Sequence, residues 1–235
     1  MIARSLACMA FISVSTAAMS YFSPATEAQP EIINPPFENF HYEKILRQDW
    51  QTSINYAQTL RFANCVTRIG GHETVSHPLT FSAGTSREWV ALNKVAQRYG
   101  SCAPVLGRVD PAILRGALAE ALWEREQVLP KAPAGAPTGA YLASLFETLP
   151  HGDTRHRYSD VPMAWLGRCA AFTMPDRSTA LVRSEPGSVE EKRAVVDLIA
   201  ASDRCGLRPT NVLIDVSIYR AAVADGLYLS SNLPN

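Results

Sequence analysis

Four of the five cysteines form two pairs of nearly equal spacing, and this pattern places the strongest constraint on the fold. Cys65 and Cys102 are 37 residues apart, and Cys169 and Cys205 are 36 residues apart. An even number of cysteines in an exported chain indicates disulfide bonds. No C-x-x-C pair occurs, so the spacing does not fit the usual zinc-ligand patterns. Four cysteines allow three pairings, and the matching spacings favour Cys65–Cys102 with Cys169–Cys205.

The sequence around the cysteines also repeats. Gly-Thr-Ser-Arg-Glu at 84–88 aligns without a gap with Gly-Ser-Val-Glu-Glu at 187–191. After a two-residue shift, residues 110–123 align with residues 215–228, and six of these fourteen pairs are identical. Cysteines, cap and final helix therefore follow in the same order twice, which predicts an internal duplication.

Each copy has the local signals of three helices. In a capping box, a hydroxyl accepts a hydrogen bond from a backbone N–H while a glutamate three residues on reaches back. Thr85–Glu88 and Ser188–Glu191 fit this pattern, and Asp110 and Asp215 are predicted N-caps of the last helices. Apolar residues at helical spacing follow these signals. The sequence predicts a mainly α-helical protein of two tandem three-helix units, each with an internal disulfide. All four tryptophans fall on predicted helices and are expected in the core: Trp50, Trp89, Trp123 and Trp165.

The N-terminus has the pattern of a secretory signal peptide. Arg4 is the only charged residue before Glu27, and the residues between them are mostly apolar or small. Thr26 and Ala28 supply small residues at the −3 and −1 positions, so we predict cleavage after Ala28, which removes Cys8. The alternative is an uncleaved membrane anchor, which serines and threonines in the apolar run disfavour. The mature chain is expected to be periplasmic or secreted, with no membrane span.

Composition shifts divide the rest of the chain. A Pro- and Gly-rich stretch at 130–139 indicates a linker, and apolar residues at 141–149 indicate a short helix after it. The predicted organisation is a signal peptide at 1–28, an extended lead-in at 29–48, a first unit at 49–125, a linker with a short helix at 126–159, and a second unit at 160–235.

Composition also limits the partners and the chemistry. Lys plus Arg and Asp plus Glu number 22 each, whereas nucleic-acid binding needs an excess of positive charge on one face. Nucleic acid is therefore not an expected partner. The chain contains no G-x-S-x-G motif and no glycine-rich phosphate loop. With both disulfides formed, no free cysteine remains in the mature chain, so we predict no catalytic residue and no cofactor.

Two histidine pairs are the remaining candidates for metal chemistry. His72-Glu73 is followed by His77, one residue too far for H-E-x-x-H, so the two imidazoles would not share a helix face. His151 and His156 have the same spacing in another expected loop. We predict no metal site. The alternative is a metal-dependent or hydrolytic enzyme with a site between the units that uses these histidines.

Arg115 and Arg220 occupy equivalent positions in the last helix of each copy, among alanines and leucines. They could bind an anionic ligand, or pair with a carboxylate or a helix end within the protein. Because both copies keep the arginine, we favour the structural role. Glu120 and Asp225 follow five residues later, so each is expected to point away from the arginine of its own helix.

The paired cysteines, the cap at 187–191 and the Arg-Gly-Ala-Leu-Ala-Glu-Ala-Leu-Trp ending at 115–123 resemble a group of uncharacterised exported alphaproteobacterial proteins. In that group a Cys-bounded unit with a similar final helix recurs, and the resemblance covers most of residues 60–228. It implies a fold and a compartment, and no activity. The sequence therefore predicts a non-catalytic binding or interaction module for a protein or an envelope component.

Overall fold

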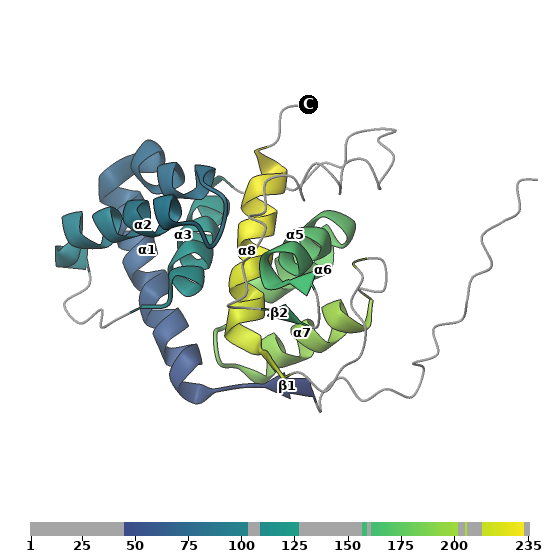
Figure 1. The fold of residues 1–235 in the computed structure, drawn as a ribbon. Helices are drawn as coiled ribbons and strands as arrows, with labels where there is room; N and C mark the ends of the chain where they lie inside the picture. The colour runs from purple at the N-terminus through teal and green to yellow at the C-terminus, as the bar shows by residue number, and fades with distance from the viewer. Residues whose placement is uncertain are drawn as a thin grey trace, which may run out of the picture. The chain divides into compact units, whose positions relative to one another are not determined.

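The computed structural model describes residues 45–102, 109–126, 157–158, 161–201, 205 and 213–232, all within one compact body that spans Phe37–Asn235. The predicted signal peptide and the predicted helix at 141–149 lie outside the described residues. The helices are α1 (Trp50–Ser76), α2 (Ser86–Arg98), α3 (Pro111–Glu126), α5 (Met163–Thr173), α6 (Pro175–Arg183), α7 (Val189–Ala200) and α8 (Val216–Ser231) (Figure 1).

Short elements connect the helices. The 3-10 turns are His77–Thr80 and Gly100–Cys102. Strand β1 (Leu46–Arg47) pairs in parallel with β4 (Ile214–Asp215), and β2 (Arg157–Tyr158) pairs antiparallel with β3 (Val161–Pro162). Within the described part of the chain, no helix is both long and apolar enough to cross a membrane.

Two disulfides divide the helices into the two predicted units. Cys65–Cys102 joins α1 to the turn after α2, and Cys169–Cys205 joins α5 to the chain after α7. The Cα–Cα distance is 5.7 Å in both disulfides. The mainly α-helical class and both pairings are therefore confirmed. The first unit contains α1, α2 and α3, and the second contains α5 to α8.

The second unit has one more helix than the first because its first helix is divided. Helix α1 runs through a kink at Gly71, where φ is +76° and ψ is 170°. In the second unit, α5 ends at Thr173 and α6 begins at Pro175. Proline lacks a backbone N–H and cannot continue the helical hydrogen bonds. The chain therefore changes direction at a similar place in both units.

The predicted caps form in both units. Thr85 Oγ1 accepts a hydrogen bond from the Glu88 amide at 3.3 Å, and Ser188 Oγ accepts one from the Glu191 amide at 3.0 Å. The glutamate side chains reach back to the amides of Gly84 and Gly187, at 2.5 and 2.7 Å. Asp110 accepts a hydrogen bond from one backbone amide in the first turn of α3, and Asp215 accepts two in the first turn of α8.

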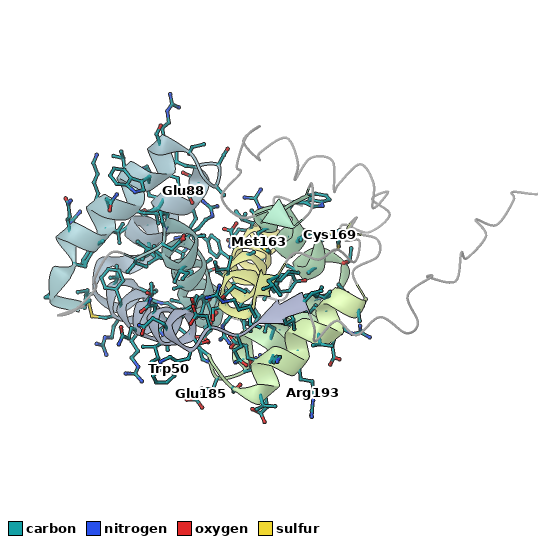
Figure 2. The ribbon with its side chains drawn as sticks, turned by 60° about the horizontal axis from the view of Figure 1, so that its bottom comes forward. Trp50, Glu88, Met163, Cys169, Glu185 and Arg193 are labelled. Atoms are coloured by element: carbon teal, nitrogen blue, oxygen red, sulfur yellow. A yellow bond between two sulfur atoms is a disulfide. The ribbon has the colours of Figure 1, made fainter. Side chains whose placement is uncertain are left out.

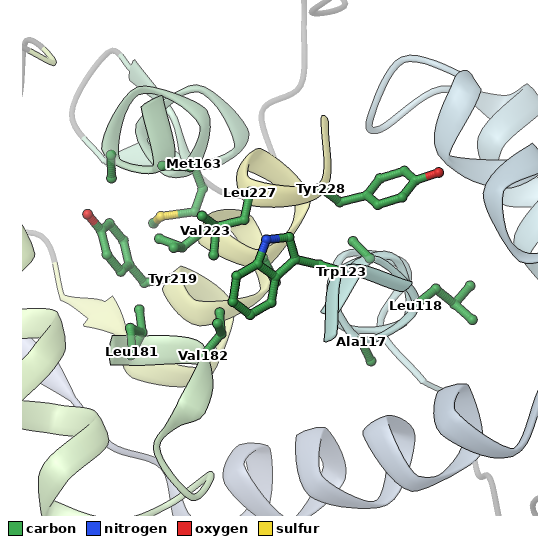
Figure 3. Close-up of a cluster of buried hydrophobic side chains, with 14 of the residues drawn as sticks. Ala117, Leu118, Trp123, Met163, Leu181, Val182, Tyr219, Val223, Leu227 and Tyr228 are labelled. Atoms are coloured by element: carbon green, nitrogen blue, oxygen red, sulfur yellow. The ribbon is translucent and has the colours of Figure 1, made fainter. Parts of the chain in front are cut away.

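Helix α8 of the second unit lies at the boundary with the first unit and packs against both α3 and α5 (Figure 1). At its crossing with α3, a Cβ added to Gly116 would meet the backbone of Ala221, so the two helices are in near-backbone contact. Apolar side chains of α3, α5, α6 and α8 then form a shared core around Trp123 (Figure 3). The core thus runs across the unit boundary.

The expectation that all four tryptophans are core residues is half wrong. Trp123 and Trp165 are buried, but Trp50 is 74% exposed and Trp89 is 53% exposed. Trp50 is the first residue of α1 and projects outward from the ribbon (Figure 2). Trp89 directly follows the buried Glu88, and the buried face of α2 is formed by other residues, so its ring is turned to solvent.

Substitution of Gly116 by alanine tests the crossing of α3 and α8. Within a helix, alanine is ordinarily more favourable than glycine by about 1 kcal/mol. Here the added methyl would force α3 and α8 apart, so we expect a loss of about 1–3 kcal/mol in the free energy of unfolding, measured by urea denaturation. Gly100→Ala is the control, because a Cβ there meets nothing within 4 Å. Equal stability of both variants would contradict the tight crossing.

Candidate functional site

Arg115 is buried at the boundary between the units, and its guanidinium joins them. Nη1 donates to Glu88 Oε1 at 3.0 Å, within the first unit. Nε donates to Asp225 Oδ1 at 2.8 Å, in the second unit. Nη1 and Nη2 also donate to the carbonyls of Phe81 and Leu79, at 2.9 and 3.0 Å. One side chain therefore holds the loop before α2, the cap of α2 and a helix of the other unit.

Arg220 makes the corresponding contacts from the second unit. Nη1 is 3.3 Å from Glu191 Oε1, and Nε and Nη2 donate to the two carboxylate oxygens of Glu120 at 3.0 and 2.6 Å. Its guanidinium also donates to the carbonyls of Val182 at 2.6 Å and Ser184 at 2.9 Å. Glu120 belongs to the first unit, so the exchange is reciprocal.

Each arginine thus binds the capping glutamate of its own unit and a carboxylate of the other. Glu120 and Asp225 do point away from the arginine on their own helix, as expected, but each pairs with the arginine of the other unit. Both arginines have the predicted intramolecular role. The sequence pattern did not indicate this exchange of partners, because it depends on how α3 and α8 cross.

Burial and ion pairing have opposite effects on the charges of this network. Burial raises the pKa of Glu88 and of Glu191, and the nearby arginines offset part of the effect. Burial alone lowers the pKa of Arg115, but the carboxylates of Asp225 and Glu88 outweigh it and raise the pKa. A buried ion pair is weak evidence of net stability, but removal of one partner leaves a costly unpaired charge. Misplacement of one unit against the other would therefore leave buried charges unpaired.

Two further side chains extend the network, and sequence reasoning missed both. Tyr56 is fully buried, donates its hydroxyl to Glu120 Oε2 at 2.7 Å, and has the Arg220 guanidinium carbon 5.3 Å from its ring centre. Burial and the Glu120 charge raise the pKa of this tyrosine. Arg168 lies 3.5 Å from Asp225 Oδ2. Neither residue aligns with a similar residue in the other unit, so the repeat pattern did not indicate them.

A small pocket opens beside Arg115, between the two units. It has a volume of about 60 Å³ and is open on one side. Glu88, Arg115 and Asp225 supply its polar groups, and Met163 and Ile218 are among its apolar walls. We call it the inter-unit pocket. It is lined by Ala83, Gly84, Glu88, Asp110, Pro111, Ala112, Arg115, Met163, Ala164, Ile218, Ala221, Ala222 and Asp225.

A larger surface groove of about 730 Å³ lies between the end of α1 and helix α2. Three exposed cations, Arg87, Lys94 and Arg98, lie along α2 in this groove, with Glu73 on the opposite wall. We call it the α1–α2 groove. It is lined by Glu73, Thr74, His77, Phe81, Ser86, Arg87, Val90, Ala91, Lys94, Val95 and Arg98.

The histidines of the alternative enzyme hypothesis do not come together in the described part of the chain. His72 is half-exposed, with Nε2 at 2.9 Å from Glu126 Oε1 and 3.4 Å from the Tyr228 hydroxyl. His77 packs edge-on against Phe81 instead. His151 and His156 lie outside the described residues. Among those residues, no group of three or more His, Cys, Asp or Glu is placed to hold a metal ion.

Comparison with known proteins does not assign this chain to a family. The chain matches no protein family model, and comparisons with the curated proteins and with the solved structures find no similar one. The resemblance to exported alphaproteobacterial proteins therefore stays a prediction.

Replacement of Arg220 by leucine tests the reciprocal network. The change leaves Glu120 and Glu191 buried without their cation, so we expect a loss of about 3–5 kcal/mol in the free energy of unfolding at neutral pH. Arg193→Leu is the matched control in the same unit, because Arg193 is exposed and projects outward (Figure 2). A loss of similar size in both variants would show that the network does not hold the units together.

The pH dependence of the Arg220→Leu variant provides a second measure. Burial already raises the pKa of Glu191, and Arg220 opposes that rise. Without Arg220 the folded chain binds protons still more tightly than the unfolded chain, so its stability rises as the pH falls. The difference in free energy of unfolding between the variant and the unsubstituted protein is therefore expected to shrink as the pH falls towards about 4.3, the ordinary glutamate pKa.

Proposed function

We propose that this protein is an exported, non-catalytic interaction module whose α1–α2 groove binds an acidic segment of a partner protein. The observation that carries the proposal is the row of exposed cations along one side of an open groove, in a chain with equal numbers of acidic and basic residues. Complementary charge guides association and fixes register between partners.

The floor of the groove provides apolar contact beside the charges. Val90 is 45% exposed, and the buried Ala91 and Val95 lie next to it on α2. An amphipathic segment can place apolar side chains on such a surface and direct its charged side chains to the rim. Arg87, Lys94 and Arg98 would then face carboxylates. This combination favours an acidic polypeptide with interspersed apolar residues.

Comparison with the second unit supports a function specific to the first. Helix α7 aligns with α2 and has Glu190 where α2 has Arg87, and Asp197 where α2 has Lys94. Arg177 of α6 donates to the backbone carbonyl of Asp197 at 3.3 Å. The positive row is therefore not required by the architecture that the two units share.

We also propose that the units arose by duplication and that the chain is exported. The shared capping contacts, disulfides and arginine contacts support duplication. Disulfides persist in oxidising compartments such as the periplasm and the extracellular medium. Together with the signal-peptide pattern at 1–28, they support a periplasmic or secreted location.

Mass spectrometry of protein recovered from the periplasm and from the medium tests export. We expect a chain that begins at Gln29 and is four hydrogens lighter than its reduced form, one pair for each disulfide. A chain that keeps Met1, or that remains in the cytoplasm with reduced cysteines, would contradict the proposal.

Charge reversal tests the groove. The probe is a labelled amphipathic peptide with glutamates on one face and leucines on the other, and its lysine counterpart is the charge control. We expect the double variant Arg87→Glu with Lys94→Glu to lose about tenfold or more in affinity for the glutamate peptide, measured by fluorescence anisotropy. Binding to the unsubstituted protein is expected to weaken as the salt concentration rises.

The matched control changes the same amount of charge on the aligned helix. Lys192→Glu with Arg193→Glu on α7 alters the net charge equally but lies outside the groove. It is expected to leave peptide affinity close to that of the unsubstituted protein. Equal losses in both double variants, or equal binding of the lysine peptide, would exclude the groove as a specific site for acidic segments.

A further inference from the structure

We infer that the inter-unit pocket is a binding site for a small phenolic molecule. This inference does not rest on the α1–α2 groove. It rests on a comparison of the pocket with the aligned place in the other half of the protein, which is filled by a tyrosine of α1.

Several residues that line the pocket have aligned counterparts in the other half of the protein. Under the sequence alignment, Arg115 corresponds to Arg220, and Asp225 corresponds to Glu120. The glycine before each capping box and the second residue of each final helix also correspond. These further pairs are Gly84 with Gly187 and Ala112 with Ser217.

The N-terminal turns of α1 occupy the counterpart of the pocket. Ser53 Oγ is 3.3 Å from Ser217 Oγ, and a Cβ added to Gly187 would lie 3.2 Å from Ser53 Cβ. One turn further on, the Tyr56 hydroxyl donates to Glu120 at 2.7 Å and its ring lies against Arg220. A phenol is thus held between a carboxylate and a guanidinium in that half.

The pocket is open because α5 begins later than α1. Cys65 aligns with Cys169, which places Tyr56 opposite position 160 and Thr59 opposite Met163. Helix α5 begins at Met163, directly after strand β3, whereas α1 begins at Trp50. Residues 157–158 and 161–162 of the second unit align with 53–54 and 57–58 of α1, and they form strands β2 and β3 instead of helical turns. Arg168 Nη2 approaches Asp225 Oδ2 at 3.5 Å, and no aromatic residue is among those that line the pocket.

The buried polar groups at the base of the pocket match those of the occupied place. Asp225 is 2% exposed; its Oδ1 accepts from Arg115, while its Oδ2 accepts no hydrogen bond in the described structure and has Arg168 Nη2 at 3.5 Å. A buried acceptor gains from a hydroxyl donor, and the Arg115 guanidinium can lie against an aromatic ring. Met163 and Ile218 supply apolar walls, as ligand pockets commonly require.

The size of the pocket limits the ligand to a single ring. A cavity of about 150 Å³ encloses a whole benzene molecule. The inter-unit pocket, at about 60 Å³ and open on one side, takes the hydroxyl and the adjoining part of one ring and leaves the opposite edge at the mouth. A para substituent on the ring would then point out of the pocket.

Titration of the folded, oxidised protein with p-cresol tests the inference. Chemical shifts of the backbone amides of Ala112, Ala164 and Ala222, which line the pocket, provide the readout. We expect saturable binding of p-cresol, and binding about tenfold weaker for toluene, which has the same ring and methyl group without the hydroxyl. No saturable shift with p-cresol, or equal binding of toluene, would overturn the inference.

A pocket-filling substitution provides the matched variants. Ala164→Leu places in the pocket the residue that the first unit has at the aligned position, Leu60, and is expected to abolish p-cresol binding. Ala200→Leu is the control, because Ala200 is exposed on α7 outside the pocket. If Ala164→Leu does not fold, Ala112→Leu replaces it. Unchanged p-cresol binding in a folded pocket-filling variant would overturn the assignment, and groove variants such as Arg87→Glu are expected to bind p-cresol normally.

Discussion

The exchange of arginine partners between the two units is the interaction on which the rest of the structure depends. Arg115 and Arg220 each hold a capping box in their own unit and a carboxylate in the other. Each guanidinium also donates hydrogen bonds to backbone carbonyls of the segment that precedes α2 or α7 in its own unit. Correct placement of α2 and α7 is thereby tied to the crossing of α3 and α8, because displacement of either helix would leave buried charges unpaired.

Local signals made the elements and the disulfides predictable from the sequence. Capping boxes, aspartate N-caps and cysteine spacing act over a few residues or a fixed chain separation, so Thr85, Ser188 and the cysteine pairs could be identified without a structure. Which side chains of a helix are buried and which face solvent was less predictable. Trp89 lies on an amphipathic helix, but the buried face of α2 includes Glu88, which bonds to Arg115, and this polar burial turns the tryptophan outward.

Features that arise between the units could not be predicted in this way. The reciprocal pairing of Glu120 and Asp225 depends on the near-backbone contact at Gly116, and nothing in either helix alone indicates it. The inter-unit pocket depends on the different start points of α1 and α5. The cations at Arg87, Lys94 and Arg98 were not singled out from the sequence either. Their position along an open groove, and their contrast with Glu190 and Asp197, become evident only in the structure.

The close contact of Gly116 with Ala221 has a consequence for how such an architecture can arise. The two residues align with each other, so the helices cross at equivalent positions, and the ion pairs on either side of the crossing are related by exchange of units. Contacts with this property are those of an isologous interface, in which one surface patch is complementary to itself. A single unit with this patch would find its missing carboxylate on a second molecule. The covalent chain brings together, at high effective concentration, two surfaces that have the geometry of a symmetric dimer.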